Sequence, residues 1–167
     1  MNTFVLFGTS ILASLVSSAV AARLFIWPRL QNIEPHRALT ALVAPHMFRF
    51  IGLSFLVPGV VSPFLPSGFA IPAAYGDFVA GGLAVVAALG LASHTSWAIK
   101  SVWLLNIFGT ADLLFAFYQG GKVGLQPGML GAGFFIVAAL VPPLLVSHAL
   151  MFGLVARRQL ATERAIS

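Results

Sequence analysis

The chain has 167 residues, of which 59% are hydrophobic and only 8% are charged, and its net charge is +5. Soluble domains are about one quarter charged, so this composition excludes an ordinary soluble protein and indicates an integral membrane protein. The basic residues are too sparse to form a nucleic-acid-binding surface, and the lack of cysteine excludes disulfides, thiolate metal sites and cysteine nucleophiles. We therefore expect membrane lipids, and no nucleic acid, as partners of the chain.

Runs of about 20 mostly apolar residues, the length that crosses a bilayer, predict five transmembrane helices. In chain order these runs lie at Thr3–Ile26, Ala38–Val57, Ala73–Ala92, Ala98–Tyr118 and Met129–Ala156. The first run lacks the positively charged start of a secretory signal, so we expect it to be retained. The sequence thus predicts an all-α integral membrane protein, with one five-helix domain over residues 1–156 and a short basic cytoplasmic tail at 157–167.

The distribution of basic residues predicts the orientation, because loops rich in lysine and arginine stay in the cytoplasm. With the C-terminus inside, seven of the nine basic residues fall at the inner side, and only Lys122 falls outside. The ninth, Arg49, lies within the second predicted helix. We therefore predict a multi-pass protein of a bacterial-type inner membrane, with the N-terminus outside and the C-terminus in the cytoplasm.

Small residues recur at every fourth position in two of the predicted helices, and such ridges allow close approach of another helix backbone. The ridges consist of Ser10, Ser14, Ser18 and Ala22 in the first helix, and of Gly76, Ala80, Ala84, Ala88 and Ala92 in the third. They predict close packing, either within the bundle or between protomers of a homo-oligomer or a larger membrane complex.

Prolines predict two irregular features. Pro142–Pro143 lies inside the fifth predicted helix, where the missing N–H groups free carbonyls near Ala138 and Ala139 and predict a kink. The connection "PGVVSPFLPSGFAIP" has four prolines and no charged residue. Because this composition is unusual for a water-exposed loop, we expect it to fold over the outer end of the bundle or to lie in the membrane interface.

A small group of polar residues within the apolar runs is the candidate site: His46, Arg49, Asn106, Asp112 and His148. Counted from the inner helix ends at about 1.5 Å per residue, His46 and His148 share one level, and Arg49 and Asp112 share the next. Arg49 is therefore predicted to pair with Asp112, so that replacing either partner alone would strand a buried charge.

Two further residues are secondary candidates. Asp77 is the alternative partner of Arg49, although it falls in the first turn of the third predicted helix and is therefore expected near the outer interface. Tyr118, at the outer end of the fourth, is the other secondary candidate.

The histidines leave several interpretations open. His46 and His148 could ligate the iron of a haem b from opposite faces, with Arg49 near a propionate. The same His/Arg/Asp group could bind a quinone or another lipophilic ligand, or form a proton or ion path. The histidines could also be structural, each hydrogen-bonded inside the bundle.

No Ser-His-acid order or HExxH motif occurs, so the sequence does not favour an enzyme. Charged residues inside apolar helices are costly and usually functional. We therefore favour a membrane protein whose buried His/Arg/Asp site binds a small lipophilic ligand or cofactor, such as a quinone, a lipid or haem b. The alternatives are a small oligomeric proton or ion channel or transporter, and a non-catalytic accessory subunit of a membrane complex.

Overall fold

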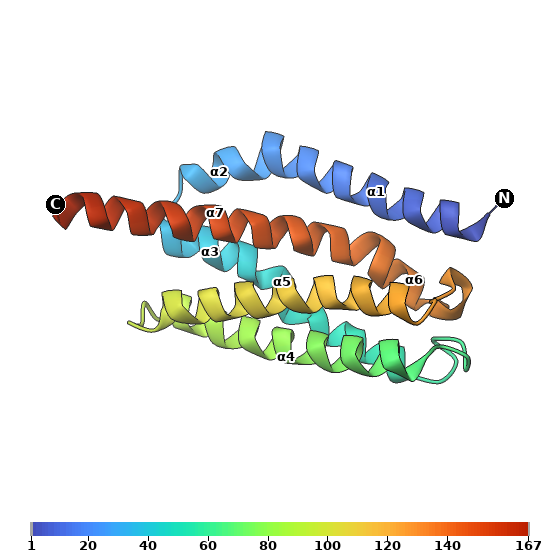
Figure 1. Ribbon diagram of the computed structural model, residues 1–167. Coiled ribbons are helices and arrows are strands. Elements are labelled where there is room, and N and C mark those ends of the chain that lie inside the picture. The colour runs from blue at the N-terminus through green and yellow to red at the C-terminus, as the bar shows by residue number, and fades with distance from the viewer. Residues whose placement is uncertain (1, 167) are drawn as a thin grey trace.

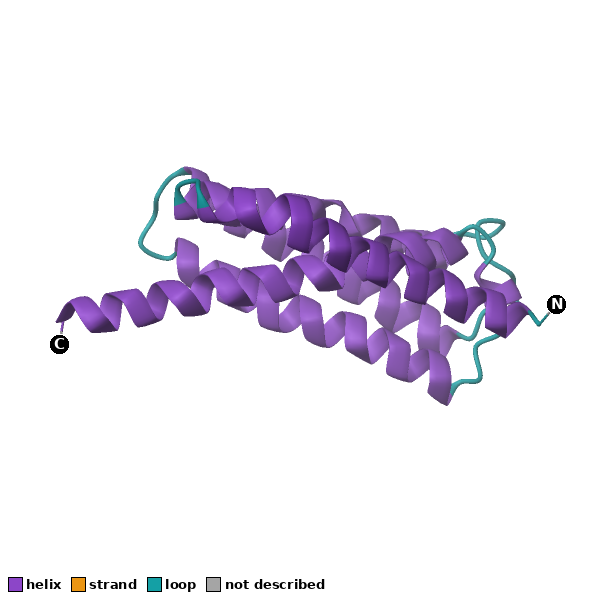
Figure 2. Ribbon diagram, turned by 90° about the horizontal axis from the view of Figure 1, so that it is seen from above, coloured by secondary structure: helices purple, strands orange, loops and turns teal. Residues whose placement is uncertain are grey.

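The computed structural model describes residues 2–166, and the side chains of residues 2–157. The helices run side by side with turns at the two ends of the bundle, and the termini lie at opposite ends (Figures 1 and 2). We call these the N-terminal end, where α1 (Thr3–Ala21) begins, and the C-terminal end, toward which α7 (Val141–Ile166) runs. Within the described residues, five helices are long and apolar enough to cross a membrane, and no β-strand occurs. The predicted all-α fold with five such helices is confirmed.

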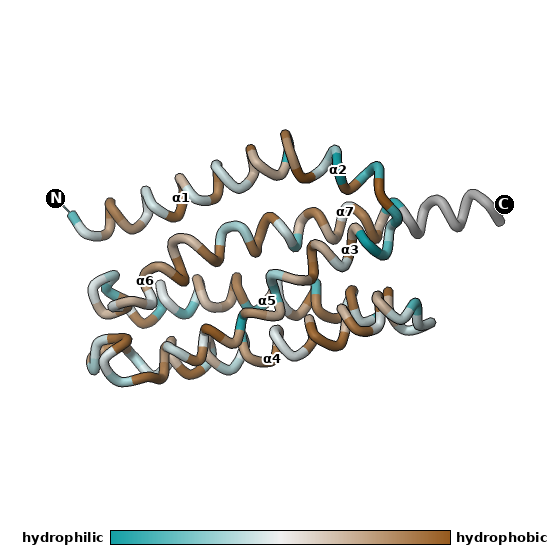
Figure 3. The backbone as a smooth tube through the Cα atoms, turned by 180° about the vertical axis from the view of Figure 1, so that it is seen from behind, coloured by the Kyte–Doolittle hydropathy of each residue, from teal (hydrophilic) through white to brown (hydrophobic). Residues whose placement is uncertain are grey.

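Hydrophobic residues recur along the long helices, whereas α2 (Trp27–Gln31) and the turn that joins it to α3 (Pro35–Val43) are strongly hydrophilic and lie at the C-terminal end (Figure 3). Three apolar clusters form the core: a small one of Leu113, Val141 and Leu144, and two larger ones. Of the two larger clusters, one, nearer the C-terminal end, includes Leu39, Val102 and Met151, and the other, nearer the N-terminal end, includes Phe69 and Leu130. The buried polar residues lie between these two larger clusters along the helices, so apolar packing encloses them from both ends.

The first helical stretch continues five residues beyond its predicted end. It consists of α1 (Thr3–Ala21), a π-helical turn η1 (Ala22–Ile26) and α2 (Trp27–Gln31). The π turn ends two residues before Pro28, whose missing N–H removes one helical hydrogen bond, so the wider turn absorbs the irregularity without ending the helix. The small residues of α1 lie on its least exposed face, and α1 contacts α7 and the π-helical turn η4 (Ile136–Leu140).

The second stretch changes helix type in its middle. It consists of α3 (Pro35–Val43) and a long 3₁₀ helix, η2 (Ala44–Leu56). The change comes at Pro45, which cannot donate to the carbonyl four residues earlier. The switch to i→i−3 bonding also frees the carbonyl of Leu42, and the Ser147 hydroxyl of α7 donates to it at 2.9 Å.

Glu34 caps the start of α3. Its carboxylate accepts hydrogen bonds from the backbone N–H groups of His36 and Arg37, both at 2.9 Å. These bonds stabilise the ionised form and lower the pKa of Glu34 below its ordinary value of 4.5. The His36 ring stacks on that of His94, with centroids 4.8 Å apart, and so joins this end of α3 to the turn after α4 (Ser67–Ala92).

The third helix, α4 (Ser67–Ala92), begins six residues earlier than the sequence predicted. Pro72 lies inside it and leaves the carbonyl of Gly68 without its helical donor. The side-chain amide of Gln119 donates to that carbonyl at 3.0 Å, from the last turns of α5 (Ala98–Lys122). The hydrogen bond that Pro72 removes is therefore replaced by one from a neighbouring helix, and the segment that the sequence predicts as a loop is helical. On α4, the small residues Ala80 and Ala84 are fully buried.

The fifth stretch begins with a separate 3₁₀ turn, and its long helical part begins at Gly133, four residues later than predicted. It consists of a 3₁₀ turn η3 (Pro127–Leu130), α6 (Gly133–Phe135), a π-helical turn η4 (Ile136–Leu140) and α7 (Val141–Ile166). The π turn precedes Pro142–Pro143, where the sequence predicts a distortion. The backbone of the predicted basic tail, as far as residue 166, continues α7, but its side chains beyond Arg157 lie outside the described residues.

The proline-rich connection folds back on the N-terminal end of the bundle. The N–H of Ser62 donates to the carbonyl of Met129 at 3.0 Å, and that of Ala132 donates to Val60 at 2.9 Å. Gly131 has a φ of 52°, and a side chain there would overlap the Val60 carbonyl. Only glycine allows this close approach.

Candidate functional site

The 3₁₀ helix η2 explains how one short segment lines the site. Its buried residues, His46, Arg49, Gly52 and Phe55, are spaced by three. In an α-helix each step of three residues rotates the side chain by about 60°, so these four would spiral away from one another. With three residues per turn they lie in one row along the face that packs on α4.

Arg49 is the centre of the site, and its side chain is fully buried, with 0% exposed. Its Nε donates to Asp77 Oδ1 of α4 at 2.7 Å, and its Nη2 donates to Asp112 Oδ2 of α5 at 2.5 Å. Its Nη1 donates to the Gly109 carbonyl of α5 at 3.2 Å. All three guanidinium nitrogens are thus engaged, and the residue ties η2 to two other helices.

The sequence predicts that Asp77 lies near the end of its helix, but the structure places it well inside the helix. Because α4 begins at Ser67, Asp77 lies ten residues inside it. The 3₁₀ geometry of η2 also contributes, since it rises about 2.0 Å per residue and carries Arg49 further along the bundle than an α-helix would. Arg49 therefore pairs with both carboxylates, and the group of three carries a formal charge of −1.

Three glycines make room for these side chains. A Cβ at Gly52 would overlap the Asp77 carboxylate, and one at Gly76 would overlap that of Asp112. A Cβ at Gly109 would lie 2.7 Å from His148 Cε1 and 2.8 Å from Arg49 Nη1. The helices approach closely at these points only because a side chain is missing.

His46 and His148 are both buried and contact each other, with ring centroids 4.2 Å apart and planes tilted by 48°. The sequence matched their depth, but axial ligands of a haem must lie on opposite faces of a porphyrin. Rings in direct contact leave no space between them for that macrocycle. The histidine pair therefore does not fit the haem that the sequence suggested.

Asn106 forms a hydrogen bond with one ring of the histidine pair. Its side-chain amide lies 2.7 Å from His148 Nδ1, and the orientation in which its oxygen accepts from the Phe152 N–H makes the amide nitrogen the donor to that ring. His148 then carries its proton on Nε2. Within the described residues, neither that Nε2 nor either ring nitrogen of His46 has a hydrogen-bond partner.

Tyr118 does not join this group, since it is 62% exposed and its ring lies beside that of Phe115, with centroids 6.3 Å apart. A metal centre is likewise not formed by the described residues, because no three of their His, Asp or Glu side chains converge on one point.

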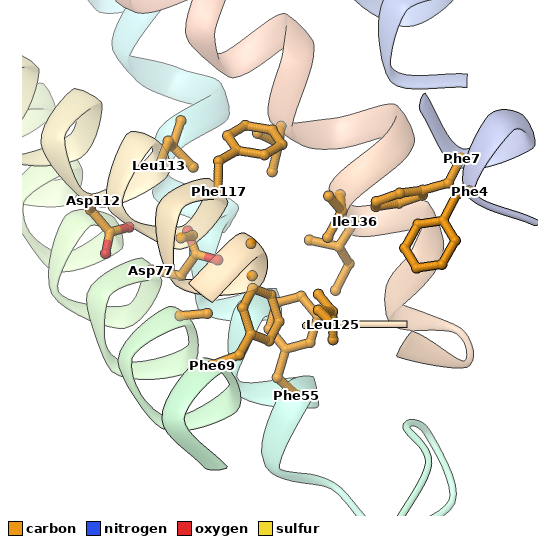
Figure 4. Close-up of a pocket in the computed structure, with 16 residues that line it drawn as sticks. Phe4, Phe7, Phe55, Phe69, Asp77, Asp112, Leu113, Phe117, Leu125 and Ile136 are labelled. Carbon is orange, nitrogen blue, oxygen red and sulfur yellow. The ribbon is translucent and has the colours of Figure 1, made fainter. Parts of the chain in front are cut away.

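A cavity of about 170 Å³ adjoins the two carboxylates. Asp77 and Asp112 lie on one side of it, and Phe4 and Phe7 of α1 lie on the opposite side (Figure 4). The rest of its lining is apolar and includes Phe55, Phe69, Ala116, Phe117 and Ile136. We call this the carboxylate pocket. A second cavity, of about 330 Å³ and lined by Ser18, Ala41, Leu144 and Ser147 among others, has no charged residue in its lining.

The sequence did not single out the phenylalanines of the site, and of its glycines it indicated only Gly76, as part of a packing ridge. The usable signals were local: Gly52 follows Arg49 by three residues, Gly76 directly precedes Asp77, and Gly109 precedes Asp112 by three. The phenylalanines had no such signal, because the chain contains 15 of them and only the packing selects those that face the carboxylates.

The fold and the buried cluster define a class of protein, an all-helical chain with five helices apolar enough to cross a membrane and an Arg–Asp–Asp group between them. Within that class, the chain belongs to the family described as Domain of unknown function (DUF8737), whose model matches residues 6–156. No curated protein and no solved structure matches the chain. The matched range includes every residue of the buried polar cluster.

The glycine contacts predict a sharp contrast between two substitutions in α4. Gly76→Ala should lower the free energy of unfolding by roughly 3 kcal/mol, because the new methyl group displaces Asp112 from Arg49. Gly82→Ala is the matched control, since nothing lies within 4 Å of its Cβ position, and it should change stability by no more than about 1 kcal/mol. Thermal unfolding of the detergent-solubilised protein measures both. Equal losses of stability would contradict the proposed role of Gly76.

The charge count predicts unequal effects within the cluster. Arg49→Gln strands two carboxylates and should cost about 3–5 kcal/mol of unfolding free energy. Asp112→Asn leaves one arginine beside one aspartate, so it should cost less than half as much. This revises the expectation that replacing either partner strands a charge. Chemical unfolding in detergent would compare them, and an equal cost for both would argue against the three-residue arrangement.

Proposed function

We propose that this protein is a multi-pass protein of a bacterial-type inner membrane that binds a small lipophilic ligand in the carboxylate pocket. The observation that carries the proposal is the position of two buried carboxylates, Asp77 and Asp112, in the wall of an otherwise apolar cavity. Charges at such depth are costly and usually serve a ligand or an ion. A mostly apolar pocket with a few convergent polar groups is the usual form of a small-molecule site.

The proposed orientation has the N-terminus outside and the C-terminus in the cytoplasm. Its support is the exposed basic residues near the C-terminal end of the bundle, which include Arg29, Arg37 and Arg157, against Lys122 alone at the N-terminal end. Short segments rich in lysine and arginine remain in the cytoplasm.

The lack of cysteine makes the orientation easy to test. A cysteine introduced at Gly128, in the turn after α5, should react with a membrane-impermeant maleimide in intact cells. A cysteine introduced at Ser96, in the turn after α4, should react only after the cells are opened. Both residues are exposed, so access to the reagent depends on the side of the membrane. The reverse labelling pattern would refute the orientation.

Ligand binding can be tested with two fluorinated probes of equal shape, para-fluorobenzyltrimethylammonium and the uncharged compound in which carbon replaces its nitrogen. Fluorine NMR with protein in lipid nanodiscs should detect binding of at least one probe. Ala116→Phe fills the carboxylate pocket and should abolish that binding, whereas Ala41→Phe fills the second cavity and should preserve it. If neither probe binds wild type more than Ala116→Phe, the proposed pocket function is wrong.

A further inference from the structure

We infer that the ligand of the carboxylate pocket is a lipophilic cation, an ammonium or guanidinium group carried on a small aromatic or branched apolar body. This inference rests on the proposed function and adds the chemical class of the ligand. Its basis is the surplus negative charge of the cluster, the accessibility of its carboxylates and the aromatic lining opposite them.

The cluster is not electrically balanced. Arg49 supplies one positive charge, and Asp77 and Asp112 supply two negative ones. Apart from these carboxylates, the residues that line the pocket are uncharged. An unbalanced charge in an apolar medium is strongly unfavourable, so the group requires a cation or a proton beside it.

The pocket gives access to the negative groups and not to the positive one. The side chains of Asp77 and Asp112 are 11% and 10% exposed, whereas that of Arg49 is 0% exposed. Arg49 uses one oxygen of each carboxylate, so Asp77 Oδ2 and Asp112 Oδ1 make no hydrogen bond with any described residue. A carboxylate or phosphate ligand would meet these oxygens and be repelled, whereas a cationic group would be attracted to them, with or without an N–H to donate.

Five phenylalanines complete the site: Phe4, Phe7, Phe55, Phe69 and Phe117. The face of an aromatic ring attracts a cation, and the attraction is strongest where water is excluded. A cavity of about 170 Å³ is close in size to one that accommodates a single benzene ring, so the body of the ligand is small.

The surplus charge also predicts that the cation competes with a proton. The titratable and charged groups facing this region are His46 and Arg49 from η2, Asp77 from α4, Asp112 from α5 and His148 from α7. Within the described residues, α1, α6 and η4 contribute none. A quaternary ammonium carries no proton of its own, so its affinity should rise with pH as the carboxylates lose the competing proton.

The two isosteric probes distinguish this inference from the proposed function. Wild-type protein should bind the quaternary ammonium at least about tenfold more tightly than its uncharged isostere. Asp77→Asn and Asp112→Asn should each reduce that preference to near unity while still binding the uncharged probe, which reports that the pocket is intact. Equal affinity of wild type for both probes would overturn the cation assignment and leave the pocket function standing. Binding of neither probe would instead refute the proposed function.

A measurement on the unmodified protein covers the case in which the variants fail to fold. The affinity of wild type for the quaternary ammonium, followed from acidic to alkaline pH by fluorine NMR, should increase, while that for the uncharged isostere should stay constant. An ammonium affinity that does not change with pH would contradict the competition between cation and proton, and with it the surplus charge on which the inference depends.

Discussion

The buried guanidinium of Arg49 is the interaction on which the middle of the bundle depends. A charge with no exposed surface is tolerated only if its donors are satisfied, and here three helix positions satisfy them, at Asp77, Gly109 and Asp112. The local sequence of all three helices follows from that requirement. Glycines at the contact points bring the backbones close enough, and the 3₁₀ form of η2 keeps Arg49 aligned with the rest of its row.

The prolines are compatible with continuous helices because each missing hydrogen bond is compensated locally. π-Helical turns precede Pro28 and Pro142, a change to 3₁₀ geometry accompanies Pro45, and a side-chain amide from α5 replaces the donor lost at Pro72. In an apolar medium a carbonyl without a donor is expensive, so these solutions are expected wherever a proline interrupts a helix. The change at Pro45 also shapes the site, since it creates the row of residues that contains Arg49.

Arg49 and the carboxylates have different relations to the cavity. The guanidinium is enclosed by protein, whereas the two carboxylates form part of the cavity wall and face phenylalanine rings. A simple structural ion pair would need only one carboxylate, so the second one gives the cavity its negative character. The histidine pair lies on the side of Arg49 that faces the apolar cluster of Leu39, Val102 and Met151. Asn106 orients one of the two rings.

The sequence by itself determined the number of long apolar helices, the depth match between Arg49 and Asp112 and that between the two histidines. These follow from counting residues along regular helices, a quantity that one-dimensional sequence contains. Only the tertiary structure decided that Asp77 joins the cluster, that the histidine rings touch, and which phenylalanines face the carboxylates. The first turns of α4 contain Pro72, whose lost hydrogen bond is replaced by a donor from Gln119, and the row on η2 comes from a helix type that residue counting at α-helical rise does not reveal. Both are set by contacts between helices, which periodicity within a single helix does not encode.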